Sequence, residues 1–153
     1  DGKLTDTLVY ESAKKGSKLN VAVDETLKGK EITMPAGLTF TDKDGTTRTE
    51  IRIKWWEDPS RSNYKSISVI PLETLPETPI DTKVLPNTNY YSDNEKFVFF
   101  GHYWLPATAP KAPLAPNIAC LDFSAGLEGP LVGYRWDGES QIDSPNFVLE
   151  SLP

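Results

Sequence analysis

The chain has 153 residues, an apolar fraction of 38%, 13 prolines and 10 glycines, which suits one compact domain with much loop. Its formal net charge of −6 argues against a nucleic acid or an anionic membrane as the main partner, and no apolar run approaches the roughly 20 residues of a membrane span. Cys120 is the single cysteine, which excludes an internal disulfide and favours a reducing, cytoplasmic location.

The first thirty residues predict two short helices. The first has Thr5 or Asp6 as its expected N-cap and stops at Gly16. Ser17 is the expected N-cap of the second helix, in which apolar residues recur at helical spacing until Gly29.

Residues 38–41 and 46–56 predict a β-hairpin around an Asp-Gly turn at 42–45. Strict alternation in the return strand places Ile51, Ile53 and Trp55 on one face. The opposite face carries Trp56 together with the cationic residues Arg48, Arg52 and Lys54. These three cations are candidate phosphate or partner contacts because guanidinium and ammonium groups suit phosphate oxygens. A solvated strand face is the alternative, and we favour it.

Four prolines between residues 66 and 92 exclude a long helix there. We expect an extended connector over the surface, with a short strand near 67–70. Strands follow at 96–100, 117–123 and 131–136, with a last one at 147–149. The apolar run 97–100 has no polar alternation, so we expect it to be buried on both faces.

The predicted fold class is α+β, mainly β. We expect one domain or domain fragment over 1–153. Its parts are helices and a hairpin in 1–65, the proline-rich connector in 66–92 and a C-terminal sheet in 93–153.

His102 is the only histidine, and it follows Gly101 at the end of a predicted strand. Imidazole is the commonest metal ligand in proteins, although a strand-end histidine satisfied by a backbone carbonyl is the alternative. Tyr103 and Trp104 either line a cleft beside it or belong to the core.

Asp122 and Ser124 follow the next predicted strand, at the same sheet edge if the strands pair. They either orient the histidine or cap a turn. We expect Cys120 to point into a packed face, without a catalytic role.

Three segments occur in a telling order: Val98–His102, Asn117–Asp122 and Gly129–Arg135. Together they resemble the C-terminal part of the calcineurin-like metallophosphoesterase family, in the bacterial branch near serine/threonine phosphatases and diadenosine tetraphosphate hydrolases. The resemblance implies the C-terminal portion of a β-sandwich, with the hairpin as an insertion. It also implies a two-metal site (Mn, Fe or Zn) that hydrolyses a phosphoester, with His102 as one ligand.

The family's other ligand sets require further histidines, which this chain lacks. The resemblance therefore implies a fragment that has no catalytic residue of its own and binds no metal alone. Its partners would be the N-terminal remainder of the same protein and the phosphoester substrate. The start at Asp1, with Met34 as the only methionine, likewise led us to expect a C-terminal fragment.

The second hypothesis is a non-catalytic module that binds protein or carbohydrate. It would use the Trp55–Trp56 end of the hairpin and the proline-rich segments as its surface.

Overall fold

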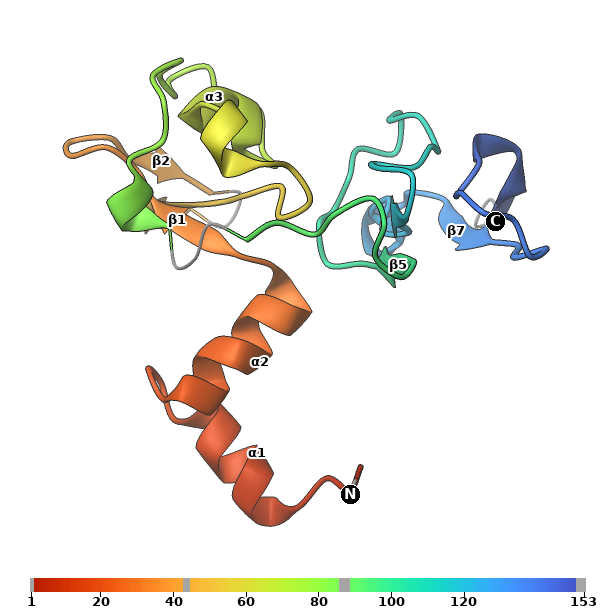
Figure 1. Cartoon of the computed structure of the whole chain (residues 1–153), viewed down its shortest axis with the longest axis horizontal. Coiled ribbons are helices and arrows are strands. Elements are labelled where there is room, and N and C mark those ends of the chain that lie inside the picture. Colours follow the sequence, from red (N-terminus) through yellow and green to blue (C-terminus); the bar gives the residue numbers. More distant parts are fainter. Residues whose placement is uncertain (1, 43–44, 86–88, 151–153) are drawn as a thin grey trace. The chain divides into compact units, whose positions relative to one another are not determined.

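The computed structural model describes residues 2–42, 45–85 and 89–150 (Figure 1). The fold is α+β, with few helices and short strands, and the strands of the described part form four two-stranded sheets. The chain divides into two compact units, Asp1–Thr88 and Asn89–Pro153. Among the described residues, no helix combines the length and the apolar character needed to cross a membrane.

The two predicted helices of the first unit are present, although the first ends at Ala13 and not at the expected Gly16. α1 spans Asp6–Ala13, and the Thr5 hydroxyl oxygen accepts a hydrogen bond from the Leu8 amide at 3.2 Å. α2 spans Lys18–Lys28, with Ser17 accepting from the Asn20 amide at 3.0 Å and Gly29 ending the helix at φ 89°. These caps satisfy amides that a helix leaves unpaired at its start. Neither helix contains a buried residue.

The first unit contains two short antiparallel strand pairs. β2 (Phe40–Thr41) pairs with β3 (Thr47–Arg48), which confirms the hairpin, although residues 43–44 of its turn lie outside the described residues. β1 (Glu31–Thr33), which the sequence analysis missed, pairs with β4 (Glu50–Arg52).

The predicted long strand 46–56 is wrong at its end. β4 stops at Arg52, and the amide of Glu57 donates to the carbonyl of Lys54 at 3.0 Å in a turn. Trp56 lies beyond the strand, so alternation does not fix its direction, and its side chain is buried with 7% of its surface exposed.

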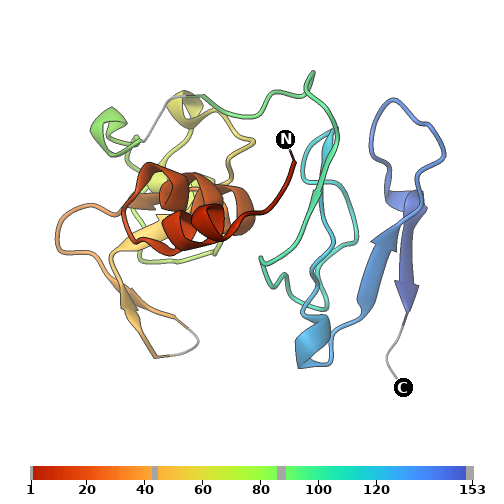
Figure 2. The ribbon, with the colours of Figure 1, turned by 90° about the horizontal axis from the view of Figure 1, so that it is seen from below.

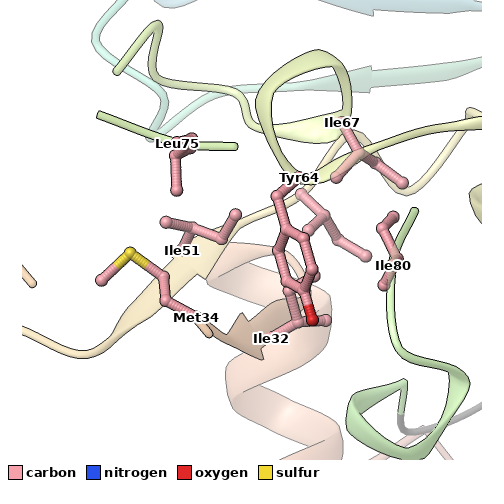
Figure 3. Packing of buried hydrophobic residues seen from close by; sticks show 8 residues of the cluster. Ile32, Met34, Ile51, Tyr64, Ile67, Leu75 and Ile80 are labelled. Atoms are coloured by element: carbon pink, nitrogen blue, oxygen red, sulfur yellow. The ribbon is translucent and has the colours of Figure 1, made fainter. Parts of the chain in front are cut away.

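The core of the first unit is a cluster of eight buried side chains (Figure 3), namely Ile32, Met34, Ile51, Ile53, Tyr64, Ile67, Leu75 and Ile80. Leu75 and Ile80 belong to the segment that we expected to run over the surface, so that expectation is wrong. The prolines prevent a long helix there, yet the apolar residues between them still gain by leaving water.

The strand expected near 67–70 is reduced to one antiparallel bridge, between Ser68 and Ile53, with the Val69 amide donating to the Arg52 carbonyl at 2.9 Å. The helical turn α3 (Tyr64–Ile67) precedes it, with a capping box in which Asn63 and Ser66 each accept the other's amide. Short 3₁₀ turns, η1 (Pro59–Arg61) and η2 (Thr82–Val84), flank it along the chain.

The second unit has its own core, formed by Ala119, Phe123, Val132, Ile142 and Phe147. β5 (Val98–Phe100) pairs in parallel with β6 (Ile118–Cys120), and β7 (Leu131–Tyr134) pairs antiparallel with β8 (Phe147–Glu150), as Figure 2 shows for the second pair. All four lie where strands were predicted. The 3₁₀ turns η3 (Ala125–Leu127) and η4 (Ser144–Asn146) precede β7 and β8.

β5 is not the fully buried strand that its apolar run predicted. Phe99 is 39% exposed, whereas every residue of β6 is 1% exposed or less. Two aromatic pairs connect the β5 segment with the β7 segment. The ring centroid of Phe99 lies 5.0 Å from that of Tyr134, and the centroid of Phe97, just before β5, lies 4.8 Å from that of Trp136, just after β7. These contacts leave part of the Phe99 ring exposed. The apolar run misled the prediction, because it does not reveal how many neighbouring strands β5 has.

Candidate functional site

The ends of β5 and β6 form the candidate site. Because the two strands are parallel, with Phe100 opposite Cys120, their carboxyl ends meet at one edge. His102 comes two residues after β5, and Asp122 comes two residues after β6. The structure thus brings together the two loops that the sequence analysis singled out.

The carboxylate of Asp122 joins these loops. Its Oδ2 accepts a hydrogen bond from the Trp104 amide and its Oδ1 accepts one from the Ser124 amide, both at 3.1 Å. Its backbone carbonyl accepts from the Leu105 amide at 3.0 Å, and the Ser124 hydroxyl donates to the Leu105 carbonyl at 2.9 Å. Hydrogen bonds to a charged acceptor are each worth about 1.5–3 kcal/mol, so Asp122 holds the loop after β5 against the loop after β6.

The backbone of both loops is left-handed at several non-glycine residues. His102 has φ 69° and Trp104 has φ 50°, while Ser124 and Glu128 have φ 63° and 65°. A left-handed L-residue costs about 1–2 kcal/mol relative to its usual conformation. Such conformations persist only where surrounding contacts impose them, and they concentrate at functional sites.

His102 is exposed, and its imidazole makes no hydrogen bond or ion pair with any residue that the structure describes. The alternative reading, a histidine satisfied by a backbone carbonyl, therefore lacks such a contact in this part of the chain. The neighbouring Tyr103 is half-buried, with its ring 4.7 Å from that of Phe100. Trp104 is 42% exposed beside the histidine. Gly101 leaves room for a methyl group, since its nearest neighbour would be the Asp122 Cβ at 3.6 Å.

Cys120 lies inside the core, as expected. It is 1% exposed, and burial raises the pKa of its thiol to about 11. A thiol with a raised pKa is a poor nucleophile at neutral pH, because the thiolate is the reactive form.

The three candidate cations belong to the first unit, and each is paired with a different carboxylate. All three form salt bridges. The nitrogen–oxygen distances are 2.8 Å for Arg48 and Asp42, 3.0 Å for Arg52 and Glu31, and 3.4 Å for Lys54 and Glu57. Lys54 also donates to the Ser66 carbonyl at 2.7 Å. An incoming phosphate would have to compete with these carboxylates, so the geometry favours a solvated strand face.

The tryptophan pair does not form an exposed surface. Trp56 is buried, Trp55 is half-buried, and their rings pack edge to face at 5.2 Å and 88°. The hypothesis of a binding module based on this hairpin was founded on exposed tryptophans, and that basis is wrong.

The resemblance implied a metal centre to which His102 contributes one ligand. An exposed imidazole without a hydrogen-bond partner suits this role, but both oxygens of the nearby Asp122 already accept backbone amides. Within the described ranges no group of three or more His, Cys, Asp or Glu side chains is arranged to hold a metal ion.

The sequence analysis missed the left-handed backbone of the histidine loop and the part that Leu105 plays in it. The sequence does not reveal either, because a single His or Trp adopts negative φ far more often than positive φ and Leu105 acts through its backbone. Comparison of the chain with protein-family models, with curated proteins and with solved structures found no match.

Proposed function

We propose that this chain is the C-terminal part of a cytoplasmic two-metal phosphoesterase of the calcineurin-like type, to which it contributes His102 as a metal ligand. The observation that carries the proposal is the presentation of this imidazole. It is exposed, it has no partner among the described residues, and it lies on a left-handed loop that the Asp122 carboxylate clamps. A histidine that only faces solvent does not require a strained left-handed backbone.

In this proposal the remaining ligands come from the N-terminal remainder of the protein, in a β-sandwich that the second unit completes. Divalent Mn, Fe or Zn would lower the pKa of a bound water and neutralise the phosphoryl oxygens of the substrate. The part played by this chain is to hold one imidazole in place, with Tyr103 and Trp104 beside it at the edge of the cleft. The chain alone would neither bind metal tightly nor turn over substrate.

The test uses the complete gene product that contains this chain. Hydrolysis of p-nitrophenyl phosphate with added Mn²⁺ is measured for the unmodified protein and for the variant His102→Asn. We expect kcat to fall by about 100-fold or more, because loss of a ligand should cost at least as much as loss of its supporting contacts. Metal content, measured by elemental analysis, should fall in parallel. Leu127→Ala, a change at a side chain 62% exposed in the same unit, serves as the control.

A second measurement examines the isolated chain, by titration with Mn²⁺ and NMR detection of the His102 ring. We expect only weak broadening and no hydrolysis. Tight binding with turnover would show a complete site within these residues and would contradict the proposal of a divided one.

The alternative, a non-catalytic protein- or carbohydrate-binding module, keeps one supporting observation. Trp104 and Trp136 of the second unit are 42% and 51% exposed, and such rings are frequent anchors in binding surfaces. Absence of both hydrolysis and bound metal in the complete gene product would favour this alternative over the phosphoesterase.

A further inference from the structure

We propose that Asp122 is a positioning residue that sets the direction in which His102 is presented. The histidine lies in a three-residue arch, Gly101–Tyr103, between the end of β5 and the amide that Asp122 binds. The significance for catalysis rests on the proposed function, whereas the control of the arch is a property of this chain alone.

Consecutive residues of one segment fix both ends of the arch. The Leu121 amide donates to the Phe100 carbonyl at 2.8 Å before the arch, and the Asp122 carboxylate accepts from the Trp104 amide at 3.1 Å after it. The separation of the two anchors is thus set by the chain after β6 and not by the loop itself. Between them, His102 is forced into the left-handed region at φ 69°.

The carboxylate cannot rotate away without losing a contact. Its Oδ2 accepts from the Trp104 amide at the end of the arch, and its Oδ1 accepts from the Ser124 amide. The Ser124 hydroxyl in turn donates to the Leu105 carbonyl. A carboxylate has acceptors on both oxygens, but an amide of the same shape places a donor on one side. In the variant Asp122→Asn, an NH₂ group would therefore face one of the two backbone N–H groups.

Simple turn capping is the competing explanation for Asp122. A turn cap would order residues 122–124 and leave the histidine loop to find its own conformation. Positioning predicts instead that His102 and Trp104 relax toward negative φ when the carboxylate is altered, because the left-handed region costs an L-residue about 1–2 kcal/mol. The two explanations therefore predict different φ angles for His102 and Trp104 once the carboxylate is altered.

The first arm of the experiment is NMR spectroscopy of the isolated chain. In Asp122→Asn we expect the strong intraresidue HN–Hα contacts of His102 and Trp104, which report positive φ, to weaken. Amide exchange at Trp104 should accelerate about tenfold or more, while the β7–β8 amides stay protected. Asp137→Asn, at an exposed aspartate of the same unit, is the matched control and should leave the arch unchanged. An unchanged arch in Asp122→Asn would overturn the proposal.

The second arm measures hydrolysis by the complete gene product. Asp122→Asn should lower kcat about 10- to 100-fold with little change in KM, as is typical of residues that orient a ligand. Normal turnover in Asp122→Asn with loss of turnover in His102→Asn would overturn the positioning role and leave the phosphoesterase standing. Normal turnover in His102→Asn would overturn the proposed function, whatever Asp122→Asn does.

A further variant guards against simple unfolding. Asp122→Glu retains the charge and both acceptors but moves them outward by one methylene group. We expect it to fold, to shift the Trp104 amide and to lose turnover. Loss of the β7–β8 amide signals in both Asp122 variants would make the residue structural and overturn the proposal.

Discussion

Four non-glycine residues of the second unit have a left-handed backbone conformation. His102 and Trp104 follow β5, and Ser124 and Glu128 follow β6; in the described ranges these are all the non-glycine residues with positive φ. Histidine is found in this region more often than most residues, but each of the four still gives up its usual conformation at a cost of about 1–2 kcal/mol. The contacts around Asp122 and the tight turn before β7 must therefore stabilise conformations that the residues themselves disfavour.

Gly129 allows the tight turn between Ser124 and β7 to close. Its amide donates to the Ser124 carbonyl at 3.0 Å, and a Cβ at this position would lie 2.0 Å from the Phe123 carbonyl oxygen. Because that oxygen belongs to the backbone, it cannot move aside cheaply. We expect Gly129→Ala to lower the free energy of unfolding of the second unit by about 3 kcal/mol, measured by urea denaturation.

Gly126 of the same loop gives the matched control. A Cβ there would meet nothing within 4 Å, so Gly126→Ala should change the free energy of unfolding by no more than about 0.5 kcal/mol. Equal stability of the two variants would contradict the steric role of Gly129.

At the candidate site, sequence reasoning singled out His102 and Asp122 but did not predict how their loops are joined. His102 and Asp122 stand out as single polar side chains after apolar strands, and the parallel pairing brings them to one edge. The division of the Asp122 oxygens between two amides depends on left-handed residues. Local propensity argues against such residues, so only the folded context reveals them.

Between β7 and β8, the loop is organised around the carboxylate of Glu139. The Tyr134 hydroxyl donates to its Oε1, the Asn146 side chain donates to the same oxygen at 3.2 Å, and the Asp137 amide donates to Oε2 at 2.9 Å. These bonds, that of Tyr134 above all, lower the pKa of Glu139 from 4.5 to about 2. The carboxylate thus ties the middle of the loop to both ends.

This network predicts a pH dependence of stability. The folded state holds the lower pKa, so its stabilisation is complete above about 4.5 and is lost as the pH falls from 4.5 through 2. We expect the loss of stability over this interval to be smaller in Glu139→Gln than in the unmodified chain, as followed by thermal unfolding of the second unit. Identical pH profiles for Glu139→Gln and the unmodified chain would contradict the assignment.

Sequence patterns predicted the elements whose signals are local. Thr5, Ser17 and Gly29 mark the helix ends through contacts with their own neighbours, and the structure confirms α1 and α2. β1 was missed because three residues give no readable alternation. Trp56 was expected on the same strand face as the cations because the alternation was extended past Arg52, where the strand ends, and the residue is buried instead.

For the whole molecule, the main feature is the presence of two separate cores. One is built from β1, β4, α3 and the proline-rich segment, and the other from β6, β7, β8 and the loops beside them. Each unit thus has the apolar cluster that a folded domain requires.

We therefore expect residues 1–88 to fold without the second unit. The amide NMR spectrum of this fragment should overlap that of the same residues in the complete chain, including the protected amides of β1 and β4. A collapsed, unprotected spectrum would show that the first core depends on the second unit. The prolines between 71 and 86 do not prevent this, because Leu75 and Ile80 already pack within the first core.

The burial of Cys120 has a practical consequence for labelling chemistry. With a pKa of about 11, roughly one thiol in ten thousand is a thiolate at pH 7, and the side chain is 1% exposed. A cysteine introduced at Leu127 would then be the single site for a maleimide fluorophore, without removal of the native residue. Such a dye would lie on the turn that follows Asp122 and would report, by its emission, changes in the surroundings of that turn.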